Sequence, residues 1–222
     1  NIVINGAMQV AQRGTSNTTA NSYLVDRFKI LITNTDNLAF SQAQVADAPA
    51  GLVSSYKFTT TTAESALAAD EIVKLRTPIE GQDLQQLKCG LSSAERTTLS
   101  FYVKGSVTGT YSVAIYQEDG NDQVGSTYAI SSANTWEQKS ITFPANTLAA
   151  MANDNTGGWV IEWNISAGSN FTATDNTSWS EYANGKQAYN HSANPILTVN
   201  STWQITGVQL EVGSVATPFE HR

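Results

Sequence analysis

The residues best suited to bind a ligand lie in one long polar segment near the end of the chain. Residues 167–195 are rich in Asn, Ser and Thr, with aromatic side chains among them. An aromatic face stacks on the apolar face of a sugar ring, and neighbouring amides hydrogen-bond to its hydroxyls. Because rigid scaffolds often carry their binding groups on loops, this segment is the candidate binding site. Its candidate sugar contacts are Trp179, Tyr182, Asn184, Tyr189 and His191.

Two other roles for these aromatic residues stay open. They can anchor the loop to the body of the fold, or they can pack in an interface between subunits. The composition of the segment does not separate these roles from sugar binding.

Glycoside hydrolysis would require a pair of carboxylates. Glu162 lies in the apolar stretch W-V-I-E-W-N, and Asp175 and Glu181 follow it in the long segment. A carboxylate buried between two tryptophans would have a raised pKa, as a general acid requires. Acidic residues more often face solvent, and we expect this of Glu162. We therefore expect the chain not to be an enzyme.

The familiar motifs of other enzymes are missing. The sequence contains no G-x-S-x-G, H-E-x-x-H, G-x-x-x-x-G-K-[ST] or C-x-x-C. His191 and His221 are its two histidines, and the lone Cys89 can form no disulfide within the chain. We expect Cys89 to be a buried small hydrophobic residue.

The stretch E-D-G-N-D offers a weak metal site. Asp119, Asn121 and Asp122 supply the oxygen ligands that calcium prefers. Asp, Gly and Asn are also the usual residues of a plain turn, which is the favoured interpretation. No other cofactor is indicated.

Short alternating segments predict the strands that must position these residues. The clearest begin at residue 97, and the first two of them predict a hairpin across Gly105 to Gly109. In the last strand, Trp203 to Val212, the alternation slips by one residue at Gly207, which predicts a bulge. Because this strand is so regular, we expect it inside a sheet. The segments are residues 97–105, 110–117, 124–130, 136–144, 159–166 and 198–211.

About ten short strands separated by Gly, Asn and Asp turns predict an all-β fold, a β-sandwich of the jelly-roll type. Short helical turns are expected at 79–88 and 146–152, and residues 63–75 have a helical composition. Residues 61–222 form the predicted sandwich. The less regular residues 1–60, which begin with a short strand, are either an appendage or part of it. The tryptophans expected in the core are Trp136, Trp159, Trp163 and Trp203.

The composition excludes several classes of partner. The formal net charge is −7, so no basic surface is available to bind nucleic acid or an anionic membrane. No apolar run approaches the roughly 20 residues of a membrane span. Only 14% of the residues are charged, which suits a secreted, virion or carbohydrate-contacting protein. Because the sequence begins Asn1-Ile2-Val3, we expect part of a longer chain.

Both ends of the sequence resemble a family of bacteriophage virion proteins, mostly tail-fibre and minor structural proteins. The resemblance rests on N-I-V-I-N-G-A-M-Q-V-A-Q-R-G with V-D-R-F, and on I-T-G-V-Q-L-E-V-G-S-V-A-T-P-F-E-H-R. The middle, with T-T-L-S-F-Y-V-K-G and W-E-Q-K-S-I-T-F-P, is similar to galactose-binding-like jelly rolls of carbohydrate-binding modules.

The resemblance implies a structural protein on the virion surface, as a tail fibre, head fibre or decoration, with a role in attachment to host glycans. It also implies a homotrimer that contacts other virion proteins. Two alternatives are a carbohydrate-binding module of a secreted glycoside hydrolase and a glycan-cleaving virion enzyme.

Overall fold

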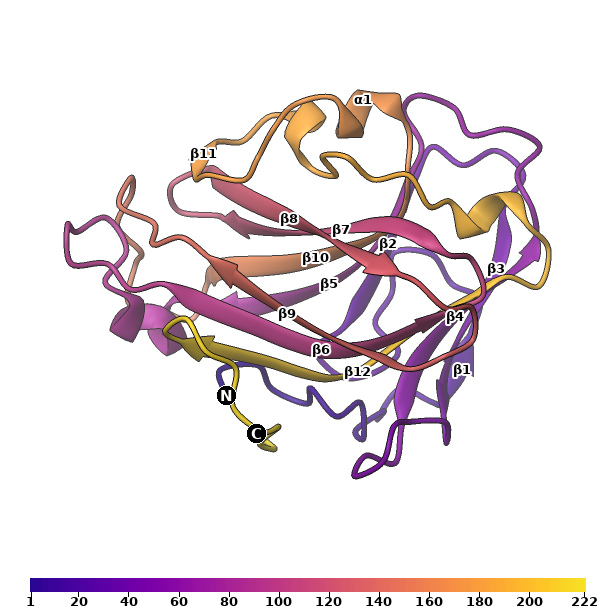
Figure 1. Cartoon of the computed structure of the whole chain (residues 1–222), viewed down its shortest axis with the longest axis horizontal. Coiled ribbons are helices and arrows are strands. Elements are labelled where there is room, and N and C mark those ends of the chain that lie inside the picture. The colour runs from indigo at the N-terminus through magenta and orange to yellow at the C-terminus, as the bar shows by residue number, and fades with distance from the viewer.

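Two six-stranded antiparallel sheets packed face to face make up the protein in this computed structural model, which describes all 222 residues (Figure 1). Sheet A has the order β1 (Ser16–Asn17), β3 (Ala39–Val45), β4 (Ser55–Thr62), β12 (Thr202–Val212), β6 (Thr97–Gly105), β9 (Glu137–Phe143). Sheet B has the order β11 (Ser180–Glu181), β8 (Asp122–Ile130), β7 (Gly109–Gln117), β10 (Gly157–Ala167), β5 (Ile72–Glu80), β2 (Lys29–Thr33). The predicted all-β sandwich of the jelly-roll type is confirmed.

Helices are few and short. A 3-10 helix, η1 (Gly81–Leu87), lies within the helical turn expected at 79–88. The others are α1 (Ser169–Thr172), η2 (Asn184–Lys186) and η3 (Pro195–Leu197). Residues 63–75 and 146–152 form no helix, so a helix was wrong for both segments, and the end of the first is part of β5, which begins at Ile72. No helix has the length and apolar character that crossing a membrane requires.

The core fills the space between the two sheets. Along β10, Trp159, Ile161, Trp163 and Ile165 point inward and are at most 1% exposed, because successive side chains of a strand alternate between faces. The ring of Trp163 packs edge-on against Phe101 of sheet A, with their centroids 5.9 Å apart. Contacts of this kind join the two sheets into one hydrophobic core.

Three of the four tryptophans expected in the core lie there, and one does not. Trp159, Trp163 and Trp203 are fully buried. Trp136 precedes β9 and is half-buried, with its Nε1 donating to Asp47 and its ring beneath the ammonium of Lys104. Cys89 is buried as expected, and burial raises the pKa of its thiol to about 11.

The predicted hairpin between β6 and β7 was wrong. β6 pairs with β12 and β9 in sheet A, whereas β7 pairs with β8 and β10 in sheet B. The residues between Gly105 and Gly109 cross from one sheet to the other. Both strands present an apolar face to the same core, and alternation alone cannot tell a partner in the same sheet from one across the core.

Residues 1–60 contribute strands to both sheets, namely β2 to sheet B and β1, β3 and β4 to sheet A. The short strand expected at the start of the chain is absent. The segment runs beside β12 through two backbone hydrogen bonds, Ile2 N to Leu210 O and Val208 N to Gly6 O. Left-handed backbone at Asn5 and Met8 then turns the chain away. Between β2 and β4 the chain forms β3 of sheet A.

The free edge of β2 is covered by the segment just before it. Ile30 N donates to Ser22 O at 3.1 Å. Ile32 N donates to the side-chain oxygen of Asn21 at 3.0 Å. These bonds satisfy the outward amides of an edge strand that would otherwise be open.

The last strand lies inside sheet A as expected, between β4 and β6. Its register shifts between Thr206 and Gln209, which confirms the bulge. Gly207 adopts a φ of +61°, and a Cβ there would lie 2.9 Å from Leu52 Cδ1. Glycine therefore suits both the backbone and the space at this position.

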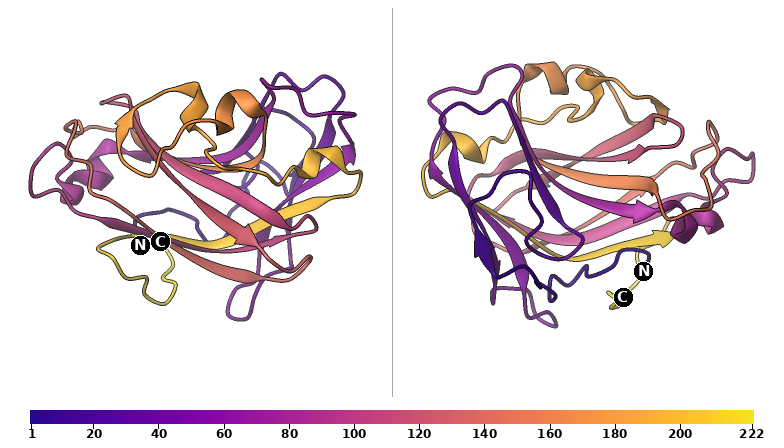
Figure 2. Two further views of the ribbon diagram at one scale, coloured as in Figure 1. Left: turned by 45° about the horizontal axis from the view of Figure 1, so that its top comes forward. Right: turned by 180° about the vertical axis from the view of Figure 1, so that it is seen from behind.

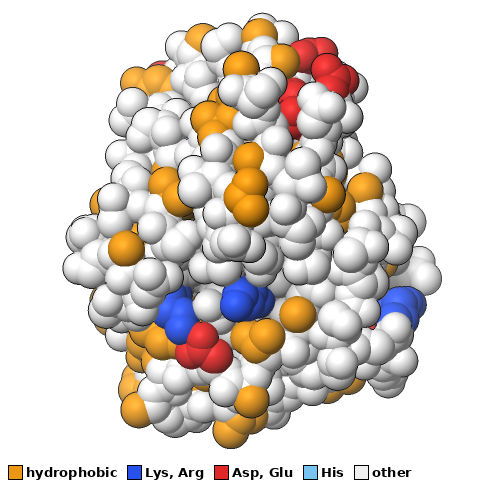
Figure 3. Space-filling view, turned by 90° about the vertical axis from the view of Figure 1, so that its right-hand side faces the viewer, with side chains coloured by type: hydrophobic (Ala, Val, Ile, Leu, Met, Phe, Trp, Pro, Cys, Tyr) orange, Lys and Arg blue, Asp and Glu red, His pale blue; other side chains and the backbone are white.

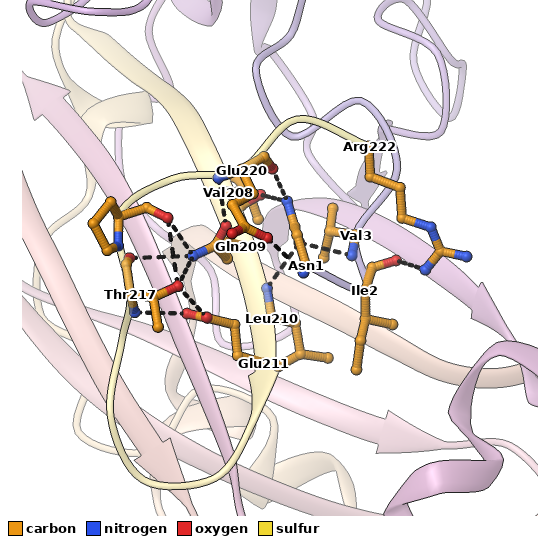
Figure 4. A network of polar contacts seen from close by, with 11 residues as sticks. Asn1, Ile2, Val3, Val208, Gln209, Leu210, Glu211, Thr217, Glu220 and Arg222 are labelled. Carbon is orange, nitrogen blue, oxygen red and sulfur yellow. Dashed lines mark hydrogen bonds and ion pairs between the residues drawn. The ribbon is translucent and has the colours of Figure 1, made fainter.

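The two chain ends are tied together by a polar network, which we call the terminal clasp (Figure 4). Asn1 Nδ2 donates to Glu220 O at 2.8 Å, and Leu210 N donates to Asn1 Oδ1 at 3.2 Å. Gln209 accepts from Glu220 N at 2.8 Å. Arg222 donates to Ile2 O at 2.7 Å. The clasp consists of Asn1, Ile2, Gln209, Leu210, Glu211, Thr217, Glu220 and Arg222.

Candidate ligand-binding groove

The segment between β10 and β12, residues 168–201, lies across the outer face of sheet B (Figure 2). We call it the covering segment. Three contacts fix the segment to the sandwich, the first at the edge of the core and the other two on the outer face of sheet B. Trp179 packs against Trp159 and donates from Nε1 to Pro144 O at 2.8 Å. Phe171 packs in a small cluster with Ile72, Ala167 and Ala188. Gly125 N donates to Asn176 O at 2.7 Å.

The close contact of Asn176 with β8 depends on Gly125. A Cβ at Gly125 would lie 2.0 Å from Asn176 Nδ2. A larger residue would therefore displace the Asn176 side chain from this position.

Beneath this cover, the outward side chains of β10 are polar but buried. Glu162 is 4% exposed, and Asn164 is completely buried. The expectation that Glu162 faces solvent was wrong, and the alternative of a buried carboxylate holds, although the tryptophans do not surround it. Trp159 and Trp163 point to the other face of the strand, and Glu162 has charged partners instead.

Glu162 forms a buried ion cluster with two cations of β5. Its Oε2 lies 2.8 Å from Lys74 Nζ, and its Oε1 lies 2.6 Å from Arg76 Nε. Lys74 also donates to Gln187 Oε1 at 2.7 Å. The Lys74 and Glu162 side chains are each 6% exposed, whereas that of Arg76 is 26% exposed. The cluster thus reaches the surface through Arg76.

A hollow of about 450 Å³ opens above this cluster. Its size is in the range of small-molecule sites. The floor comes from β2, β5 and β10, and the walls come from β7 and the covering segment. It is lined by Leu31, Thr33, Asn34, Asp70, Ile72, Lys74, Arg76, Tyr116, Glu162, Asn170, Phe171, Tyr182, Asn184 and Gln187.

Two tyrosines form an aromatic wall of the hollow. The rings of Tyr116 and Tyr182 are 5.3 Å apart and inclined by 64°. Their hydroxyls donate to Asn121 Oδ1 at 3.0 Å and to Asn184 Oδ1 at 3.1 Å. Burial, with the negative charge of nearby glutamates, raises the pKa of both phenols. They are therefore neutral and present both a ring and a hydroxyl.

Two further hollows extend this one along sheet B. The second, of about 130 Å³, shares Arg76 with the first and is also lined by Tyr23, Lys29, Pro78, Glu118 and Val160. The third, of about 320 Å³, shares Tyr23 and Pro78 with the second and adds Gln12, Arg13, Asp26 and Arg27. We call the three together the sheet-B groove.

Two of the five predicted sugar contacts, Tyr182 and Asn184, line the groove. Trp179 anchors the covering segment, and the half-buried Tyr189 lines none of the three hollows. His191 is only 7% exposed. Its Nδ1 accepts from Ser112 N at 3.1 Å and its Nε2 donates to Ala193 O at 2.5 Å, so both ring nitrogens have partners. Burial lowers the pKa of His191 to about 4.

Sequence reasoning missed Lys74, Arg76, Tyr116 and Gln187. A signal for the first two was present in I-V-K-L-R, where the cations occupy alternate positions between aliphatic residues. Such a pattern places both charges on one face of a strand. Glu162 pairs in register with Arg76, so the carboxylate and the cation meet across two strands.

The carboxylates considered for hydrolysis are not brought together. Asp175 is exposed and accepts from Thr177 N at 2.8 Å. Glu181 is exposed on β11, and neither residue lines the groove. Glu162, the third of the set, is already paired with two cations.

The candidate calcium ligands lie at the turn between β7 and β8 and point to different partners. Asp119 accepts from Ala152 N at 2.9 Å, and Asn121 accepts from Tyr116. Asp122 is buried, with Asn146 as its hydrogen-bond donor. No group of three or more His, Cys, Asp or Glu is arranged to hold a metal ion.

No protein-family model matches the chain, and no curated protein matches its sequence. The fold is similar to the enzymatically active domain of tailspike protein 4 of bacteriophage CBA120, with a TM-score of 0.51 and 14% identity. That match covers 96% of this chain and 21% of the tailspike chain, so the present chain spans about a fifth of its length.

Two bacterial structures are similar over nearly their whole length. One is a putative sugar-binding protein from Bacteroides thetaiotaomicron, with a TM-score of 0.48 and 12% identity over 96% of this chain and 99% of that one. The other is the family 11 carbohydrate-binding module of a cellulase of Clostridium thermocellum, with a TM-score of 0.44 and 10% identity over 92% and 98%.

Proposed function

We propose that the chain is a non-catalytic carbohydrate-binding domain whose site is the sheet-B groove. The observation that carries the proposal is the hollow of about 450 Å³, in which the Tyr116–Tyr182 wall stands over a buried polar floor. The rings offer faces to the apolar side of a sugar. Asn184, Gln187 and Asn170 line the same hollow and can hydrogen-bond to hydroxyls.

The absence of enzymatic activity is part of the proposal. Hydrolysis of a glycoside by the usual route needs two carboxylates on either side of the scissile bond. Glu162 neutralises buried cations, and Asp175 and Glu181 lie outside the groove. The tailspike domain is described as enzymatically active, and a glycan-cleaving role is therefore the alternative that a cleavage assay must exclude.

We further propose that the domain belongs to a phage virion surface protein, a tail fibre, head fibre or decoration that attaches to host glycans. The support is the resemblance of both chain ends to virion structural proteins. Those two stretches contact each other in the terminal clasp, so they act as one structural unit. A homotrimer in contact with other virion proteins completes this proposal, and light scattering of the purified chain tests the trimer.

A glycan array tests the binding function. Wild-type protein should bind at least one glycan class. Tyr182→Ala should weaken that binding about tenfold, because it removes one of the two stacking rings; a nucleic-acid base stacked on an aromatic ring contributes about 1–3 kcal/mol, and we expect an effect at the lower end of this range. The matched control is Tyr102→Ala, on the outer face of sheet A. Equal loss in both variants, or no glycan bound by the wild type, contradicts the proposal.

The array also separates the groove from the other residues predicted from sequence. Trp179→Phe keeps the packing against Trp159 and removes the hydrogen bond to Pro144 O. Binding should be unchanged in this variant, since Trp179 lines none of the three hollows.

A further inference from the structure

The middle of the sheet-B groove contains more positive charge than its partners neutralise. Lys74 and Arg76 share the single carboxylate of Glu162. Lys29 lies directly opposite Arg76 in the β2–β5 register and forms no ion pair. Like charges directly opposite each other on neighbouring strands are destabilising. Lys74 and Arg76 thus share one buried carboxylate, and Lys29 adds a third cation beside Arg76.

Arg76 also has unused hydrogen-bonding capacity. A guanidinium has five N–H donors, and Glu162 lies beside only the Nε of Arg76. Its two terminal nitrogens have no partner in the protein, and the side chain lines both the first and the second hollow. That pair of nitrogens forms the fork that binds a carboxylate through two parallel hydrogen bonds.

Two cations lie near the ring of Tyr23, which lines both the second and the third hollow. Lys29 Nζ lies 5.8 Å from the ring centre of Tyr23, and Arg13 Cζ lies 5.7 Å from the same centre. Five of the twelve Lys and Arg residues of a chain with net charge −7 line the groove, namely Arg13, Arg27, Lys29, Lys74 and Arg76. Arg27 is already paired with Glu80 at 3.3 Å, so the excess lies at Lys29, Lys74 and Arg76. The face drawn in Figure 3 is mostly uncharged, with a few separate Lys, Arg, Asp and Glu side chains.

The groove also holds acidic groups, and they do not cancel this excess at its centre. Asp26 lies 3.8 Å from Arg13, and Asp70 accepts from Asn34 in the first hollow. Glu118 lines the second hollow and forms no ion pair with Lys29 or Arg76. The unpaired edge of Arg76 and the ammonium of Lys29 therefore remain available to an anion.

We propose that the sheet-B groove binds an acidic glycan, and that Arg76 and Lys29 hold the carboxylate of a uronic or sialic acid residue. The inference rests on the proposed carbohydrate-binding function and specifies its ligand. A neutral sugar would leave the cation excess unrelieved, whereas a carboxylate at Arg76 would neutralise it. The same interaction explains why an unfavourable arrangement of charge lies beside the aromatic wall.

Matched pairs of sugars test the proposal by calorimetry. Oligogalacturonate is compared with its methyl ester, in which the carboxylates are masked. Sialyllactose is compared with lactose, which lacks the sialic acid residue. We expect the acidic member of at least one pair to bind about tenfold more tightly, as a charge-assisted bidentate contact allows, and this preference to shrink as salt is raised.

Variants locate the preference. Arg76→Gln should reduce the acidic preference to about twofold or less, because it removes the fork and leaves Glu162 paired with Lys74. Lys29→Gln should reduce it by about threefold. Arg96→Gln, an exposed arginine outside the groove, is the control and should change nothing.

Two outcomes overturn the inference in different ways. If neutral glycans bind in a Tyr182-dependent manner with no preference for the acidic member, the ligand class is wrong and the binding function stands. If no sugar of the array or the pairs binds, both proposals fail. A sulfated glycan that binds while every carboxylated one does not also overturns the choice of carboxylate.

Stability measurements give a readout that needs no ligand. If the three cations repel one another, Lys29→Gln should raise the midpoint of thermal unfolding at low salt, and the gain should disappear at high salt. A lower midpoint for Lys29→Gln at low salt contradicts the excess of positive charge on which the inference depends.

Discussion

The terminal clasp and the sheet-B groove are both polar networks that border a hollow, and they differ in whether their hydrogen-bonding groups already have partners in the protein. In the clasp, the Asn1, Gln209 and Glu211 side chains all hydrogen-bond to other parts of the two chain ends. In the groove, Arg76 and Lys29 direct charge toward a hollow. A network that satisfies itself stabilises a fold, whereas one that leaves donors beside a hollow can bind a ligand.

The largest expected effect is on the groove side. Glu162→Gln leaves the buried Lys74 without its anion, and we expect the free energy of unfolding to fall by about 4 kcal/mol. Denaturant titration measures it. Glu118→Gln, which removes an unpaired acidic group of the groove, should change stability little. If both variants lost the same free energy of unfolding, the buried ion pair would contribute no more to stability than an exposed carboxylate.

The next effect is a pH dependence that belongs to His191. Burial lowers its folded pKa to about 4 from an ordinary 6.5, so acid protonates the unfolded chain first. Its contribution is complete above pH 6.5 and is lost as the pH falls toward 4, at up to about 1.4 kcal/mol per pH unit. His191→Asn should flatten this part of the stability profile. A wild-type profile that matches the variant would mean that His191 titrates normally.

A smaller effect is expected in the clasp. Gln209 is completely buried and bridges the last strand to Thr217 and Glu220. Gln209→Ala should cost about 1–2 kcal/mol through unsatisfied backbone groups and leave glycan binding unchanged. Gln86→Ala, at an exposed position, is the control. Weakened binding in the Gln209 variant would show that the two networks are coupled.

The smallest effect concerns Glu211 at the edge of the clasp. Burial opposes its ionisation, but hydrogen bonds from Thr217 outweigh burial and lower the pKa of Glu211. Its contribution is present above the ordinary pKa and is lost as the pH falls through the lowered value. We expect Glu211→Gln to cost about 0.5 kcal/mol at pH 7 and nothing near pH 2. A cost that persists at low pH would assign the effect to packing.

Sequence reasoning predicted elements better than it predicted partners. Alternation identified β6 with its bounds, and the slip at Gly207 identified the bulge of β12. These patterns depend on which face of a strand is apolar, which is local information. The wrong hairpin between β6 and β7 and the half-buried Trp136 depend on which sheet a strand joins, which is not local.

Contacts between strands far apart in the sequence also explain why only part of the candidate site was predicted. The covering segment was identified by composition, and two of its residues, Tyr182 and Asn184, line the groove. The charged floor comes from β5 and β10, which are far apart in sequence and meet only in the folded sheet. Burial of Glu162 under the covering segment could not be inferred from its own strand, because the alternation of β10 says only that it faces away from the core.

The sheet edges are protected against pairing with strands of other molecules, which matters at high protein concentration. β1 and β11, at the ends of the two sheets, have only two residues each. The outward amides of β2 already bond to Ser22 and Asn21. At the remaining edge, β9 carries the ion pair of Lys139 and Glu137. Strand-to-strand aggregation therefore has few starting points, and concentrated solutions of the domain should stay free of β-fibrils.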